Sequence, residues 1–178
     1  MYLILNIEQI DMYYITFLEP KENNIVNGTF TKLFFSDNKI TMNGLYLKFN
    51  PSKIQFIDPI VKKYSDDNWY KPKILETKYK QLFQFDPISN IDYFNYFFDL
   101  EKKLLQYYLE YNNIKKQAVY VLKNQLMSGT ARYYREHIIP TIPGKKTGYY
   151  LKISGIWETK QDVGITYKII EYVYDINN

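Results

Sequence analysis

One long amphipathic helix, set among strand-like segments, narrows the range of folds open to this sequence. From Ile91 to Leu109, apolar residues recur three and four positions apart, which places them on one side of a helix. Ser89 or Asn90 can cap the N-terminus, and Asp92 favours the first turn. The sequence therefore predicts a helix over about residues 90–112. The charged run Glu101 to Lys103 interrupts the apolar stripe, so we expect the middle of this helix to be partly exposed.

Strand patterns precede this helix, over about residues 2–60. Residues 29–35 and 39–49 flank the tripeptide Ser-Asp-Asn, which has the length and composition of a hairpin loop. Gly44 lies inside the second of these strands and predicts a bulge or the close approach of another backbone. Residues 61–88 or so follow Pro51 and Pro59 and contain Pro72 and Pro87, so we read them as an irregular excursion.

Two further strands over residues 148–175 predict a hairpin after the helix. Because side chains alternate along a strand, one face collects apolar residues and the other collects lysine and tyrosine. The predicted apolar face consists of Leu151, Ile153, Gly155, Trp157, Ile165, Tyr167 and Ile169. The predicted opposite face includes Tyr150, Lys152, Ser154, Ile156, Lys168 and Tyr172.

The order of strands, one helix and a terminal hairpin predicts a β-rich α+β fold. An OB-type barrel has this order, with a helix before its last strands, and so do many other α+β domains. Two architectures therefore stay open, an OB-like barrel or a curved antiparallel sheet, each with one long amphipathic helix before a C-terminal hairpin. The length of 178 residues favours a single domain over residues 1–178, with a basic segment at 113–147 between helix and hairpin.

The composition excludes several classes of protein. The sequence has no cysteine, which excludes disulfide scaffolds and thiolate metal sites. The N-terminal residues carry no basic region, and Glu8 and Asp11 come too early for a secretory signal. No apolar stretch is long enough to cross a bilayer. We expect an intracellular protein, in the cytoplasm or nucleus, or one packaged in a virion, and neither a secreted protein nor a membrane partner.

Positive charge is concentrated between Asn113 and Lys152. This segment holds eight basic residues and one acidic residue, Glu136, which give +7, whereas the whole chain carries a net charge of +4. The basic residues are Lys115, Lys116, Lys123, Arg132, Arg135, Lys145, Lys146 and Lys152. Such a segment can attract a polyanion even when the overall charge is modest, although a solvated lysine-rich surface has the same composition.

Motifs for catalysis or cofactor binding are weak. The run PGKKTG at 143–148 resembles the end of a phosphate-binding loop, but the pattern requires glycine at Ile139. His137 is the sole histidine, so a transition-metal centre or a catalytic triad would have to form around one imidazole. Asp66 and Asp67 are adjacent carboxylates, more typical of a solvated turn than of a cation site. We expect no enzyme activity, no metal and no cofactor.

The predicted lysine and tyrosine face of the hairpin suggests a nucleic-acid surface. Single-stranded nucleic-acid binders pair cationic side chains, which follow the phosphates, with aromatic rings, on which bases stack. The candidate binding residues are Tyr150, Lys152, Lys168 and Tyr172, extended by Lys145 and Lys146 and by Arg132 or Arg135. In a strand, Arg132 and Tyr134 face one way and Tyr133 and Arg135 the other, so one arginine can join this surface. A half-exposed sheet covered by tyrosine and lysine is the competing interpretation.

Two stretches of the chain resemble a known family. TFTKLFFSDNKITMNGLYLKF and YYLKISGIWETKQDVGITYKI are similar to segments of OB-type single-stranded DNA-binding proteins of nucleocytoplasmic large DNA viruses, some of which resemble the phage T7 type. The resemblance implies sequence-tolerant binding of single-stranded DNA in viral DNA replication or recombination. Replication or virion proteins are possible partners, and a homo-oligomer is a possible state. The alternative is a non-enzymatic virion structural or protein-interaction module, since tyrosine is also abundant in protein interfaces.

Overall fold

The structure is a computed structural model of the 178-residue chain, and it describes residues 3–23, 27–57, 80–135 and 145–175. Residues 61–79 of the predicted excursion, which include the adjacent Asp66 and Asp67, lie outside the described residues, as does His137.

A long antiparallel hairpin forms the centre of the sheet. Strand β10 (Lys145–Glu158) pairs with β11 (Asp162–Asp175) along almost their whole length. The sequence predicts this hairpin from residue 148, and in the structure it begins three residues earlier. Lys145 and Lys146 therefore belong to a strand and not to a loop.

Along each edge of this hairpin, two shorter strands pair with successive stretches of it. On the β10 edge, β5 (Leu45–Lys48) pairs with Tyr150–Ile153, and β3 (Gly28–Ser36) pairs with Gly155–Glu158. On the β11 edge, β8 (Gln117–Val119) and β9 (Thr130–Arg135) both run parallel to β11. The hairpin is thus the element that joins the N-terminal strands to the middle of the chain.

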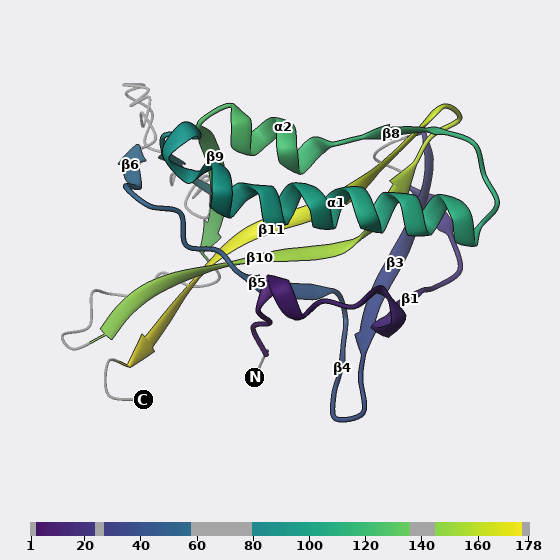
Figure 1. The fold of residues 1–178 in the computed structure, drawn as a ribbon, viewed down its shortest axis with the longest axis horizontal. Coiled ribbons are helices and arrows are strands. Elements are labelled where there is room, and N and C mark those ends of the chain that lie inside the picture. The colour runs from purple at the N-terminus through teal and green to yellow at the C-terminus, as the bar shows by residue number, and fades with distance from the viewer. Residues whose placement is uncertain (1–2, 24–26, 58–79, 136–144, 176–178) are drawn as a thin grey trace, which may run out of the picture.

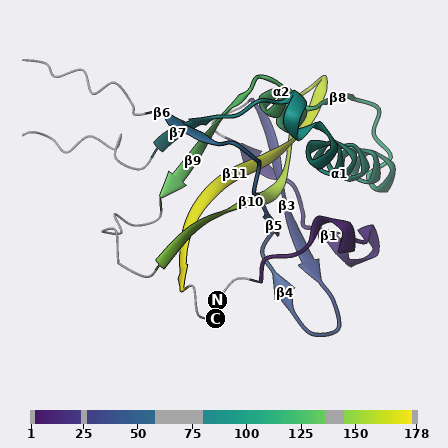
Figure 2. The same cartoon turned by 60° about the vertical axis from the view of Figure 1, so that its left-hand side comes forward.

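The remaining strands extend the sheet on both sides. Strand β3 pairs with β1 (Ile15–Phe17), β2 (Lys21–Asn23) and β4 (Thr41–Met42), while β9 pairs with β7 (Lys80–Gln84), and β7 with β6 (Gln55–Ile57). Strand β7 lies in the segment predicted to be irregular. The path runs from β1 to β6, and within the described residues these two strands do not pair. The fold is therefore α+β and strand-rich, with an open mixed sheet (Figure 2) where the sequence predicted a barrel or an antiparallel sheet.

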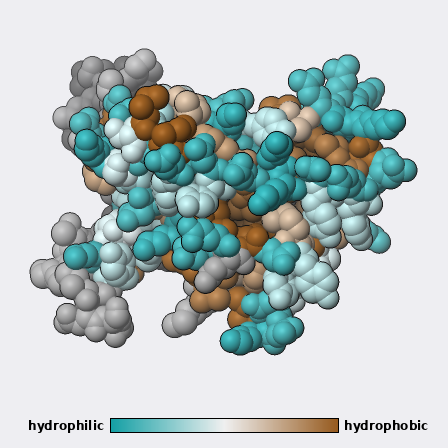
Figure 3. Space-filling view, viewed as in Figure 1, coloured by the Kyte–Doolittle hydropathy of each residue, from teal (hydrophilic) through white to brown (hydrophobic). Residues whose placement is uncertain are grey.

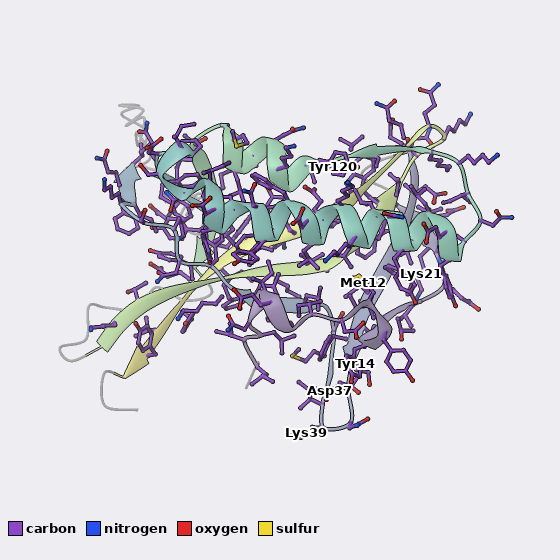
Figure 4. All side chains as sticks on the ribbon, viewed as in Figure 1. Met12, Tyr14, Lys21, Asp37, Lys39 and Tyr120 are labelled. Atoms are coloured by element: carbon purple, nitrogen blue, oxygen red, sulfur yellow. The ribbon has the colours of Figure 1, made fainter. Side chains whose placement is uncertain are left out.

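Two α-helices cover one face of the sheet (Figure 1). Helix α1 (Ile91–Tyr111) has the predicted position, and α2 (Val121–Met127) leaves the β11 edge between β8 and β9. Tyr120 stands at the junction of β8 and α2 (Figure 4). Single 3-10 turns lie at Ile7–Gln9, Met12–Tyr14 and Ile88–Asn90. Viewed from the helix side, hydrophilic side chains cover much of the surface (Figure 3).

Aromatic side chains fill the space between α1 and the sheet. The Phe49 ring lies 6.5 Å from that of Phe94 and 5.7 Å from that of Phe97, both on α1. Phe83 on β7 stacks on Tyr133 of β9 with ring centroids 5.3 Å apart. Each of these five rings is 2% exposed or less, so much of the aromatic content of the chain serves the core.

The charged run in the middle of α1 is partly exposed, as predicted, but its first residue is buried. Glu101 is fully buried, although its neighbours Lys102 and Lys103 are exposed. Its two carboxylate oxygens accept hydrogen bonds of 2.9 Å from the backbone N–H groups of Leu122 and Lys123. These donors belong to the first turn of α2, whose own N-cap residue makes no side-chain hydrogen bond. A carboxylate from one helix therefore caps the other.

Gly44 fulfils the prediction of a close backbone approach. Its φ is +100°, a region that side-chain-bearing residues rarely adopt, and an added Cβ would lie 2.5 Å from the carbonyl oxygen of Ile153. This approach lies where β5 begins to pair with β10.

Because of a β-bulge in β10, the two faces of the hairpin carry different residues from those predicted. Ile153 pairs with Tyr167, but the next pair is Gly155 with Thr166, so Ser154 is an extra residue in β10. Beyond the bulge the alternation is inverted. Ile156 is therefore buried beneath the helices, whereas Gly155 and Trp157, predicted on the apolar face, lie on the opposite face.

Candidate nucleic-acid interface

The sheet has a second face, turned away from α1 and α2, which we call the outer face. Strand alternation and the pairing registers place basic and aromatic residues there from five strands, β3, β5, β9, β10 and β11. The aromatic members are Phe30, Phe34, Tyr46, Tyr134, Tyr150, Trp157, Tyr172 and Tyr174, and the basic members are Lys32, Lys48, Arg132, Lys146, Lys152 and Lys168. Among the described strand residues at outer-face positions, the one acid is Asp162, at the tip of the hairpin.

Three of these cations form a row across β10, β11 and β9. Lys152 is directly opposite Lys168 in the hairpin. Arg132 precedes Tyr133, the partner of Ile169, so the parallel register brings Arg132 beside Lys168. None of these three cations has a carboxylate partner in the described part of the chain. The ion pair found there joins Lys116 to Glu158, on the helix side of the sheet.

Tyrosine rings hold two cations of this row. The Lys152 ammonium lies 4.8 Å from the ring centroid of Tyr46, and the Lys168 ammonium lies 5.4 Å from that of Tyr134. Such cation–π contacts favour the charged amines without neutralising them. The positive charge therefore stays available to an external anion.

Four tyrosines form a chain of ring contacts across β5, β10 and β11. The centroid distances are 5.6 Å from Tyr46 to Tyr150, 5.9 Å from Tyr150 to Tyr172 and 5.7 Å from Tyr172 to Tyr174. Tyr46 and Tyr150 are 3% and 4% exposed, Tyr172 is half-buried, and Tyr174 is 43% exposed. Burial, and then the neighbouring Tyr174, raises the pKa of Tyr172. Tyr150 thus shares the predicted face, but its ring supports the sheet and is not open to a stacked base.

A pocket of about 390 Å³ lies at the β5 edge of this face. Its lining residues are Ile4, Leu5, Asn6, Lys48 and Tyr172. The N-terminal segment is fixed there because the Leu5 N–H donates to the Tyr46 carbonyl at 2.7 Å and the Lys48 N–H donates to the Leu5 carbonyl at 3.4 Å. The pocket combines an apolar wall, an aromatic ring, an amide and a cation.

The other predicted binding residues are distributed as strand alternation requires. Lys146 is exposed and lies opposite Tyr174, on the outer face. Arg132 is exposed on that face, while Tyr133 is buried in the core. Lys145 and Arg135 occupy the alternate strand positions, and their side chains lie outside the described ones.

The outer face also carries a group of aromatic and basic residues that the sequence analysis did not predict. Trp157 of β10 is opposite Phe30 of β3, and Lys32 is opposite Gly155. The Trp157 ring also covers Gly164, where an added Cβ would lie 2.5 Å from it. The bulge at Ser154 places this group on the outer face, and the glycine at 155 is the sequence signal for it.

The helix side carries a separate polar cluster. The Tyr108 hydroxyl lies 3.0 Å from the Thr31 hydroxyl and donates to Glu158 at 3.2 Å, while Lys116 donates to Glu158 at 2.8 Å. Burial, as the largest cause, raises the pKa of Tyr108. These polar groups hydrogen-bond to one another, and the contacts join α1 to the end of β10.

Metal-ligand clusters and membrane-spanning helices are absent from the described segments. Over these residues no three His, Cys, Asp or Glu side chains gather where they could hold a metal ion. Likewise, none of the helices described is both long and apolar enough to cross a membrane.

In comparisons with known proteins, no family model, no curated protein and no solved structure matches the chain. The function is therefore argued from the geometry of the outer face.

Proposed function

We propose that this protein binds single-stranded nucleic acid, with DNA favoured, across the outer face of its sheet and with little sequence preference. The observation that carries the proposal is the row formed by Lys152, Lys168 and Arg132, three adjacent cations without a carboxylate partner in the described part of the chain. A role in viral DNA replication or recombination is part of the proposal and comes from the resemblance of residues 29–49 and 149–169.

Electrostatics favours an anionic ligand at this row. Like charges directly opposite one another on a sheet destabilise it, so Lys152 and Lys168 oppose folding when no counter-ion is present. Adjacent strands are about 4.8 Å apart, so the row spans about 10 Å from β10 to β9. A phosphate backbone crossing the strands would place negative charge along this span and relieve the repulsion.

Aromatic rings next to the row suit the bases of such a strand. Tyr172 and Tyr134 are half-buried and Tyr174 is more exposed, so parts of their rings remain accessible. Stacking on an aromatic ring is open to every base, which gives affinity with little sequence dependence. Phe30 and Trp157 offer a second partly exposed group at the far end of β10.

The charge row is tested with a double substitution and a matched control. Lys168→Ala with Arg132→Ala removes two exposed cations from the outer face. Lys102→Ala with Lys103→Ala removes two exposed cations from α1, on the opposite side of the sheet. The measurement is fluorescence anisotropy of a labelled oligothymidine over a series of salt concentrations.

The outer-face pair should weaken binding and reduce the salt slope by about 0.7 for each phosphate that the protein no longer neutralises, while the α1 pair changes little. Equal effects of the two pairs would show that net charge alone drives binding. If both double variants bind as tightly as the parent, the outer face is not the interface, and a protein-interaction role becomes the better interpretation.

A further inference from the structure

The pocket at the β5 edge differs from the rest of the outer face in its chemistry. The cation row can bind a phosphate backbone, and the aromatic rings around it can stack on any base. This pocket also contains a side-chain amide. Asn6 is exposed, and its side chain makes no capping hydrogen bond to the 3-10 turn that follows it. An asparagine amide has two donors and one acceptor group, so it can recognise the edge of a base.

The position of the Tyr172 ring is set by a glycine. Gly148 is opposite Tyr172 in the hairpin, and a Cβ added at Gly148 would lie 2.7 Å from the ring. The missing side chain lets the ring lie over the β10 backbone and reach the pocket shared with Lys48 and Ile4. Tyr172 therefore forms one wall of the pocket, where a planar group can stack on it.

From this arrangement we infer that the pocket holds a single adenine base of the bound strand, an inference that rests on the proposed function. Tyr172 stacks on the base, Lys48 contacts the adjoining phosphate, and Asn6 bonds the adenine edge. Asparagine pairs with adenine through two hydrogen bonds, to N6 and N7, and on this edge no other base presents that donor and acceptor pair. In an unpaired strand these edges are accessible. A volume of about 390 Å³ lies within the range of small-molecule sites.

The test compares two labelled oligonucleotides of equal length, an oligothymidine and one in which thymidine alternates with deoxyadenosine. Alternation ensures that an adenine can reach the pocket in some register. We expect the parent to bind the alternating strand at least about fivefold more tightly, because a bidentate pair of hydrogen bonds gives discrimination of that order.

Asn6→Ala should abolish this preference, so that the variant binds the two strands with equal affinity. Asn95→Ala, which removes an exposed asparagine from α1, should retain the preference. Gly148→Ala should displace the Tyr172 ring, weaken binding to both strands and reduce the preference. Its backbone has no positive φ and the obstructing atoms end a flexible side chain, so the variant should fold, which circular dichroism checks.

Failure of the inference can be distinguished from failure of the proposed function. If the parent binds neither strand, the proposed function is wrong and the pocket inference falls with it. If the parent binds both strands equally, or if Asn6→Ala retains the preference, the adenine pocket is refuted while binding to the outer face stands. An unchanged Gly148→Ala variant would refute the part assigned to Tyr172.

Discussion

Replacing Glu101 by alanine tests whether a carboxylate on α1 holds the start of α2. The substitution removes both acceptors of the Leu122 and Lys123 N–H groups, each bonded at 2.9 Å. A buried donor without a partner costs about 1–3 kcal/mol, so two such donors give about 2–6 kcal/mol. Removing a buried charge recovers part of this, because the carboxylate no longer loses its hydration on folding. We expect the free energy of unfolding to fall by about 2–4 kcal/mol.

The assay is urea unfolding followed by far-ultraviolet circular dichroism, with the midpoint compared at constant slope. Glu110→Ala is the control, since it removes an exposed glutamate from the same helix and should change stability by no more than about 0.5 kcal/mol. A Glu101→Ala variant as stable as this control would refute the assignment of Glu101 as the cap of α2.

The pH dependence gives a second test of the same group. Burial raises the pKa of Glu101, against the opposing effect of the N–H groups of Leu122 and Lys123. The folded state therefore binds the proton more tightly than the unfolded state, and the contribution of Glu101 to stability declines as pH rises above the usual carboxyl range. Glu101→Gln cannot titrate, so the unfolding free energy of the parent minus that of this variant should decrease from acidic pH towards neutrality. An increase over this range would contradict the sign.

Three other perturbations test separate parts of the structure. Gly44→Ala should cost more than about 1 kcal/mol in urea unfolding, because φ is +100° and the new Cβ would meet the Ile153 carbonyl; a neutral result would refute the close approach. Hydrogen bonds from the Ser89 hydroxyl, and then from the Ile88 N–H, lower the pKa of Asp86. The stabilisation that the Asp86 carboxylate gives the fold is therefore present above the usual carboxyl range and is lost as pH falls. Asp86→Asn should make the stability of the protein less dependent on pH on the acid side. Tyr174→Ala should weaken oligothymidine binding by about 1–3 kcal/mol if one base stacks there, whereas Tyr96→Ala, a similarly exposed ring on α1, should not.

Patterns that depend on a single segment were predictable from the sequence. The spacing of Phe94, Phe97 and Leu104 indicates α1, because one helix face must bury them whatever lies opposite. The alternation of Lys168, Ile170 and Tyr172 predicts the outer side of β11 correctly. In β10 the alternation holds only as far as Ile153, since one extra residue inverts every position beyond it.

Features that depend on distant partners were not predictable. Tyr150 was expected to be open to a base, but Tyr46, from a strand far away in the sequence, packs against it. Glu101 looks like a break in the apolar stripe because its partners are backbone groups of a helix that the sequence does not clearly predict. Parallel pairing of β9 with β11 likewise has no local signal, and it helps to make the sheet mixed.

The central hairpin also determines the order in which the molecule can assemble. Strands β3, β5, β8 and β9 all precede β10 and β11 in the chain, and each completes its pairing only on this hairpin. During synthesis, the residues before Lys145 therefore leave the ribosome before the hairpin that joins these strands has been made. Many native contacts span long stretches of chain, a topology that makes folding slow. Chains shortened before residue 145 would expose several unpaired strand edges at once, and unpaired edges lead to aggregation.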